Sequence, residues 1–155
     1  MSPDTAAVER DRALYLDGLE AFELGAFYES HETLEDLWLR NRSEVRPFLQ
    51  GLIQLAAGYW HLERRRLAPA LSLFRSGSAK LAPFAPVTLG LDVARLLLEV
   101  EACRVHAEDL GPDRLDAFDW TLRARPRVEP PSLTAFRPHR GVVPHPTRAL
   151  TVAGR

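Results

Sequence analysis

Apolar residues recur at helical spacing along most of the chain and predict five helices separated by turn residues. Gly25 follows the first predicted helix, and Gly111-Pro112 follows the fifth, as helix-ending residues do. A short sixth helix is expected over residues 113–122, and no stretch alternates apolar and polar residues as strands do. The pattern predicts an all-α fold with its main helices at residues 4 or 5 to 24, 27–40, 45–65, 68–80 and 89–109.

The third predicted helix is apolar nearly all round between residues 48 and 62, which is typical of a central, buried helix. Its strongly polar side chains there are Gln50, Gln54 and His61, and they share one stripe. Gly51 and Gly58 flank that stripe. Because glycine has no side chain, we expect a neighbouring helix or a ligand to approach closely at these two positions.

A weak internal repeat joins two parts of the sequence at an offset of 40 residues. Residues 25–34 align with residues 65–74, and each segment contains a tight turn between two helices. This is the unit that tetratricopeptide-like solenoids stack. Two ordinary αα-hairpins in a small bundle would give the same pattern. We therefore expect a compact bundle of five to six helices built from TPR-like αα-hairpins.

Charge is distributed unevenly although the whole chain has a net charge of -1. Residues 1–122 contain 20 acidic and 13 basic residues, whereas residues 123–155 contain seven arginines and one acid, Glu129. The second segment also holds six of the twelve prolines and has no apolar periodicity. The sequence predicts a helical domain over residues 1–122 and an extended or disordered tail over residues 123–155.

The remaining composition excludes several classes of protein. The single cysteine, Cys103, excludes an intramolecular disulfide and a cysteine-based zinc cluster. The first residues lack the basic and apolar regions of a signal peptide, and no apolar run approaches the roughly 18 residues that a membrane span needs. We expect a soluble cytoplasmic protein without a membrane partner.

The second predicted helix carries polar residues on its apolar side. On a helical wheel, Phe27, Leu34 and Trp38 define the apolar stripe, and His31 lies in its middle. Glu35 lies one turn further along the same side. A carboxylate buried there needs a partner, a cavity or a metal ion. We therefore expect a polar cluster in the core that joins this helix to the next one, formed by His31, Glu32, Glu35, Gln50, Gln54 and His61.

Two motifs resemble a known family. Residues 29–38 read E-S-H-E-T-L-E-D-L-W, residues 48–54 read F-L-Q-G-L-I-Q, and residues 90–93 read G-L-D-V. Together they resemble domain of unknown function 309, whose pattern is E-A-H-E-x-L-E-x-x-W followed by Q-G-L-I-Q, with Ser30 in place of the usual alanine. The resemblance covers about residues 10 to 100 and implies an all-helical single domain without an established reaction. It places the family's signature on His31, Glu32, Glu35, Trp38, Gln50 and Gln54.

The polar cluster has three interpretations. It can be a buried hydrogen-bond network that fixes how the two helices pack. It can be a metal or catalytic site, with His31 and Glu35 on one helix face and Gln54 or His61 as the third ligand. The H-E-x-x-E string, however, lacks the second histidine of the H-E-x-x-H zinc motif. Finally, it can be a pocket for a small polar ligand, anchored by His31 and by Glu32 or Glu35.

These interpretations lead to three hypotheses about function. The first is a non-enzymatic interaction or scaffold protein that needs no cofactor and binds a protein partner or a second copy of itself. The second is a metal-assisted hydrolase, in which Glu32 or Glu35 is the general base and His31 binds a divalent metal. The third is nucleic-acid binding through the arginine-rich tail, whose charge could instead fold back onto the acidic domain.

Overall fold

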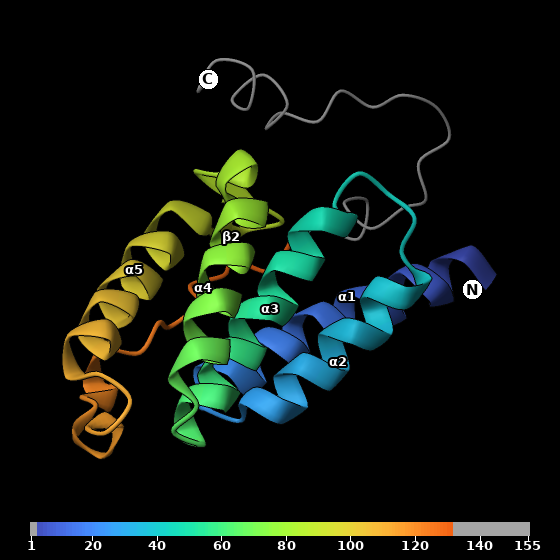
Figure 1. Cartoon of the computed structure of the whole chain (residues 1–155). Coiled ribbons are helices and arrows are strands. Elements are labelled where there is room, and N and C mark those ends of the chain that lie inside the picture. The colour runs from blue at the N-terminus through green and yellow to red at the C-terminus, as the bar shows by residue number, and fades with distance from the viewer. Residues whose placement is uncertain (1–2, 132–155) are drawn as a thin grey trace.

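The computed structural model describes residues 3–131 and confirms the all-α prediction (Figure 1). Two short strands and three single-turn 3-10 helices complete this part of the chain. The predicted second helix has the bounds expected for it, and the fourth begins and ends within about one residue of expectation. The α-helices are α1 (Pro3–Glu23), α2 (Phe27–Arg40), α3 (Arg46–Glu63), α4 (Leu67–Leu81) and α5 (Val93–Leu110).

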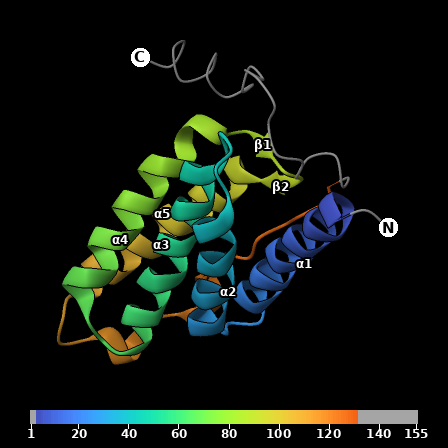
Figure 2. The same ribbon diagram turned by 90° about the vertical axis from the view of Figure 1, so that its right-hand side faces the viewer.

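The helices pack in chain order, each against the next, and α3 lies between α2 and α4 (Figures 1 and 2). α3 is buried over most of its surface, as its apolar sequence predicts. Tyr59 on α3 lies at the centre of the core. Its ring stacks on Phe27 at 4.9 Å and meets Phe22 and Phe74 edge-on, so that side chains from four helices converge there.

The α1–α2 and α3–α4 hairpins have the same turn, 40 residues apart. Gly25 and Arg65 both have positive φ, 80° and 57°. In each turn the amide of that residue donates to the carbonyl three residues earlier, and the following amide donates to the carbonyl five residues earlier, over 2.8–3.0 Å. This is the Schellman ending of a helix. The repeat expected from the sequence is therefore present as two αα-hairpins with one backbone geometry.

Glycines allow the helices of each hairpin to approach closely. A Cβ atom on Gly18 would lie 2.6 Å from the Leu34 side chain, and one on Gly58 would lie 2.8 Å from the Phe74 ring. These two pairs are also 40 residues apart. A Cβ atom on Gly51 would lie 3.0 Å from a backbone oxygen of α4. The prediction that a neighbouring helix approaches at Gly51 and Gly58 is confirmed, and that helix is α4.

The predicted start of the fifth helix at residue 89 is wrong, because a small β-hairpin precedes α5. Strand β1 (Val87–Thr88) pairs antiparallel with β2 (Leu91–Asp92), and the two residues between them have φ of 47° and 75°. Such short strands leave no alternating pattern in the sequence. The Asp92 carboxylate then accepts a hydrogen bond from the Arg95 amide at 3.0 Å and caps α5.

The predicted sixth helix is also wrong, since residues 113–122 form two separate 3-10 turns, η2 (Leu115–Ala117) and η3 (Trp120–Leu122). The third 3-10 turn, η1 (Ala82–Phe84), follows α4. Phe118 has an extended backbone, with ψ of 131°, and this ends η2. The Asp119 side chain then accepts hydrogen bonds from the amide and hydroxyl of Thr121, which starts η3.

The first nine residues of the predicted tail are extended and lie against the helices, and the rest, residues 132–155, lies outside the described residues. The Ala124 amide donates to the Tyr59 hydroxyl at 2.9 Å, and the Glu129 amide donates to the Gly90 carbonyl at 2.8 Å. Figure 2 shows this segment, in orange, running alongside α1 toward the β-hairpin. Among the described residues, no helix is long and apolar enough to cross a membrane.

Candidate functional site

The buried face of α2 is rotated from the predicted stripe. It contains Phe27, Ser30, Leu34 and Leu37, so that His31 lies at its edge and not in its middle. Ser30 can be buried because its hydroxyl donates to the Gly18 carbonyl at 2.8 Å. The helical wheel did not assign Ser30 to the core, but its short polar side chain packs against α1.

His31 and Glu35 form a partly exposed pair. Their Nε2 and Oε2 atoms are 3.2 Å apart, and the side chains are 31% and 43% exposed. Glu32 is exposed. The prediction of buried carboxylates in the core is therefore wrong, because the rotation of α2 brings these acids to water. Glu35 needs no buried partner, because its side chain is partly exposed to water.

The polar residues of α3 do not complete the predicted buried network. Gln50 is half-buried, and Oε1 of Gln54 is buried without a hydrogen-bond partner in the described structure. No hydrogen bond within residues 3–131 joins either glutamine to His31 or Glu35. The structure thus places His31, Gln54 and His61 along the seam between α2 and α3, with no hydrogen bond between them in the described residues, and leaves Glu32 exposed.

Trp38 lies toward the opposite end of that seam. The guanidinium of Arg46 stacks over its ring, 4.0 Å from the centroid, and Nε1 of Trp38 is buried without a partner. Six buried side-chain polar atoms in the described residues lack a partner, and four of them belong to seam residues: His31, Trp38, Gln54 and His61. Such atoms are rare in folded proteins and mark places where water or a ligand binds.

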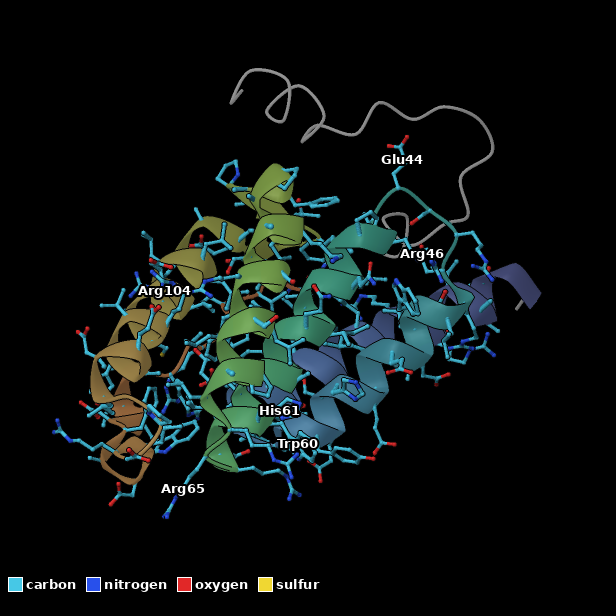
Figure 3. The ribbon with its side chains drawn as sticks, in the orientation of Figure 1. Glu44, Arg46, Trp60, His61, Arg65 and Arg104 are labelled. Atoms are coloured by element: carbon cyan, nitrogen blue, oxygen red, sulfur yellow. The ribbon has the colours of Figure 1, made fainter. Side chains whose placement is uncertain are left out.

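A small pocket opens at the end of the seam nearer the α1–α2 turn. It has a volume of about 130 Å³ and lies on the part of α3 that carries Trp60 and His61 (Figure 3). The Tyr28 ring lies 6.2 Å from that of His31 and 5.9 Å from that of Trp60. Both hairpins contribute to the pocket, which is lined by Tyr28, His31, Ala57, Trp60 and His61.

Two imidazoles give the pocket its polar character. Burial lowers the pKa of His61, and the nearby charges of Arg66 and Arg64 lower it further, so that this ring is neutral near pH 7. Nε2 of His31 lies 3.2 Å from Oε2 of Glu35, which leaves Nδ1 of this ring for a ligand. Nδ1 of each ring is buried and has no partner in the described structure. The pocket therefore offers the His61 acceptor, and a second unpartnered ring nitrogen on His31, to a ligand that carries a hydrogen-bond donor.

Comparison with known families identifies the segment that builds this pocket. Residues 15–73 match the model of a domain of unknown function, DUF309. Over these residues the chain is similar to the DUF309 family. The DUF309 region begins within α1 and ends within α4, and it contains the whole α2–α3 seam. No curated protein and no solved structure matches the chain.

Metal binding was one interpretation of the DUF309 signature residues. Within residues 3–131, no three or more His, Cys, Asp or Glu side chains are arranged to hold a metal ion. His31, Glu35 and His61 are therefore not gathered around a common point. Sequence reasoning missed Tyr28 in the aromatic lining, although Tyr28 precedes His31 by one helical turn and the spacing indicates a shared face.

Three of the seven arginines of the predicted tail, residues 123–155, have contacts in the described structure. Arg125 pairs with Glu23 at 2.9 Å, and Arg127 lies 3.9 Å from Glu99. Arg123 donates to two carbonyls at the end of α1, at 2.6 and 3.3 Å. These three residues fold back onto the helices. The other four arginines of the predicted tail, and the nucleic-acid contacts expected of them, lie outside the described residues.

Proposed function

We propose that the DUF309 region is a non-enzymatic interaction module whose α2–α3 pocket receives one side chain of a protein partner. The size of the pocket is the observation that carries this proposal. A volume of about 130 Å³ is close to the roughly 150 Å³ of a cavity that binds one benzene molecule. It is well below the roughly 300 Å³ at which pockets for whole small molecules begin. A single ring fits, as an anchoring side chain does at a protein interface.

The lining indicates which side chain the partner supplies. Tyr28 and Trp60 give aromatic walls, and the Nδ1 atoms of His31 and His61 are buried without a partner. A ring that also carries an N–H or O–H donor satisfies both features, and these are the properties of tryptophan and tyrosine side chains. Displacing water from the walls supplies affinity, and the donor fixes the orientation.

The surface around the pocket favours a partner with basic residues beside its ring. The outward face of α2 carries the exposed acids Glu29, Glu32 and Asp36, and Glu35 is partly exposed. Complementary charge speeds the encounter of two proteins and excludes wrong partners. We therefore expect an aromatic anchor flanked by lysine or arginine. The TPR-like hairpins act as the scaffold that holds the two walls of the pocket.

Ligand-observed NMR with indole and 4-methylphenol tests the proposal. Ala57→Leu fills the pocket, and Ala102→Leu makes the same change at an exposed position on α5 and is the matched control. Both probes are expected to bind the wild type and Ala102→Leu more tightly than toluene, which lacks a donor, and to lose binding to Ala57→Leu. Equal binding to both variants, or no preference over toluene, would contradict the proposal.

One observation favours a hydrolase as the second candidate. Glu35 orients His31 and leaves Nδ1 in the pocket lining, as the carboxylate of a catalytic triad orients its histidine. His31 would then act as a general base toward water, without a metal. Hydrolysis of 4-nitrophenyl acetate tests this candidate. A rate that falls in His31→Asn and not in His106→Asn would support it, and equal rates in the two variants would reject it.

A further inference from the structure

A second cavity lies at the end of α3, where the chain after α5 passes it. Its volume is about 310 Å³, within the range of small-molecule pockets. It shares no lining residue with the α2–α3 pocket and combines the C-terminal end of the DUF309 helix α3 with two turns beyond that region. The lining residues are Leu62, Glu63, Arg65, Leu115, Asp116 and Trp120.

One part of the lining is apolar and fixed. Leu62 and Leu115 are buried in the core. The Trp120 ring lies 4.8 Å from that of Phe118 and 6.3 Å from that of Phe27, so neighbouring rings hold it in place. An aromatic face of this kind accepts a cation or a planar guanidinium. The apolar floor suits a methylene chain.

The other part of the lining carries three charges. Glu63, Arg65 and Asp116 are exposed, and within residues 3–131 none of them forms a salt bridge or a side-chain hydrogen bond. Burial raises the pKa of Glu63, and the charge of Glu29 adds to this effect while Arg64 opposes it. The charge of Arg64 thus offsets only part of the desolvation of Glu63. Figure 3 shows the Arg65 side chain leaving the α3–α4 turn on its own.

The backbone at Arg65 is unfavourable for an arginine. Its φ of 57° lies in the left-handed region, and the equivalent position of the first hairpin holds Gly25. Glycine would make the same turn without strain. Strained backbone of this kind is found where a side chain has a task at that position. Arg65 thus makes the turn with more backbone strain than glycine would, and its side chain lines the cavity.

We propose that this cavity binds a free basic α-amino acid, with the chemistry of arginine or lysine. The Arg65 guanidinium would pair with the carboxylate of the ligand, as arginine does in bidentate geometry. Glu63 and Asp116 would pair with its two cations. One base and two acids match a ligand with one carboxylate and two cationic groups, so that the charges of the complex cancel. The methylene stem would lie over Leu62 and Leu115 beside Trp120.

Calorimetric titration of the full chain with five compounds tests each part of this assignment. L-arginine and L-lysine carry all three charges. Agmatine and cadaverine lack the carboxylate, and norleucine lacks the side-chain cation. We expect L-arginine and L-lysine to bind and the other three to bind at least about tenfold more weakly, since one charged hydrogen bond is lost in each case. Equal affinity for agmatine and L-arginine would overturn the role of Arg65.

Two variants and a matched control complete the test. Arg65→Gly keeps the turn and removes the guanidinium, and Asp116→Asn changes an exposed side chain only. Each should weaken L-arginine binding about tenfold or more, while Arg66→Gln, the loss of a neighbouring positive charge outside the cavity, should not. Undiminished binding to Arg65→Gly and Asp116→Asn, or no binding of L-arginine at millimolar concentration, would overturn the proposal. Ala57→Leu should bind normally, because the two cavities are separate.

Discussion

The α1–α2 and α3–α4 hairpins have the same backbone and different side chains. Gly18 and Gly58 occupy equivalent positions and admit a large side chain of the partner helix in both hairpins. The turn positions differ, with Gly25 in one and Arg65 in the other. At the helix contact, where only glycine leaves room for the facing side chain, both hairpins have glycine. At the turn, where space is not limiting, the residues differ, and the second hairpin has an arginine whose side chain lines a cavity.

The same comparison explains the pocket between the hairpins. His31 on α2 is equivalent to Leu71 on α4, and Tyr28 is equivalent to Ala68. Leu71 is buried, 9% exposed, whereas His31 remains partly exposed at a cavity. The apolar side chain of Leu71 therefore packs into the core on α4, whereas the ring of His31 lines a pocket on α2. The expectation that position 31 faces the core is met by its counterpart in the second hairpin.

The largest expected difference is between truncations at these two positions. Leu71→Ala should lower the free energy of unfolding by about 2–3 kcal/mol, because it leaves a cavity in the core. His31→Ala should cost less than about 1 kcal/mol, because it removes only a partly exposed side chain and its contact with Glu35. Urea unfolding measures both. Similar losses for the two variants would show that His31 belongs to a buried network after all.

The glycine contacts should be sensitive in both hairpins. Gly18→Ala and Gly58→Ala each place a Cβ atom less than 3 Å from a buried side chain, and we expect each to destabilise the fold by about 1–3 kcal/mol. In Gly58→Ala, the second change Phe74→Leu should restore part of the loss. Unfolding measurements that find either single variant as stable as the wild type would contradict the close approach of that hairpin.

Exchanging the turn residues should change stability in opposite directions. Gly25→Arg should cost about 1 kcal/mol, because a residue with a Cβ atom is strained at φ of 80°. Arg65→Gly should gain up to about 1 kcal/mol by relieving the same strain, less the greater entropy of glycine in the unfolded chain. Thermal unfolding measures both. A loss of stability in Arg65→Gly would mean that the arginine side chain supports the fold.

The smallest expected effect is the pH dependence from His61. Because its folded pKa is lowered below 6.5, the unfolded chain binds more protons as the pH falls below that value. His61 therefore stabilises the fold fully above pH 6.5, and this contribution decreases between 6.5 and its folded pKa. His61→Gln should lose less stability between pH 7.5 and 5.5 than the wild type. An equal loss in both proteins would show that the His61 pKa is unshifted.

Much of the helical core was predictable from the sequence, because helix ends and apolar periodicity are local signals. Gly25 and the turn at Asn41 bound α2 as expected, and the apolar surface of α3 indicated its central position. The β-hairpin was not predictable, because each strand has two residues and the turn depends on Leu89 at positive φ. The sequence left open whether the tail folds back onto the helices. The packing of residues 123–131 could not be decided because its contacts, such as that of Ala124 with Tyr59, join distant parts of the chain.

The candidate site was predictable in its residues but not in its arrangement. The signature spacing located His31, Glu35 and the polar stripe of α3. It could not show that Ser30, whose hydroxyl donates to the Gly18 carbonyl of α1, would be buried in place of His31. The orientation of a helix with two possible faces is decided by packing against its neighbours, and a wheel drawn for one helix does not contain that information.

The most direct test of the pocket is NMR of the imidazole nitrogens of His31 and His61, with and without indole. We expect Nδ1 of His61 to be an unprotonated acceptor at pH 7.5. The resonances of both imidazoles should shift when indole is added, and Ala57→Leu should abolish these shifts while Ala102→Leu preserves them. A protonated Nδ1 on His61, or resonances that indole leaves unchanged in the wild type, would contradict a binding site between the two hairpins.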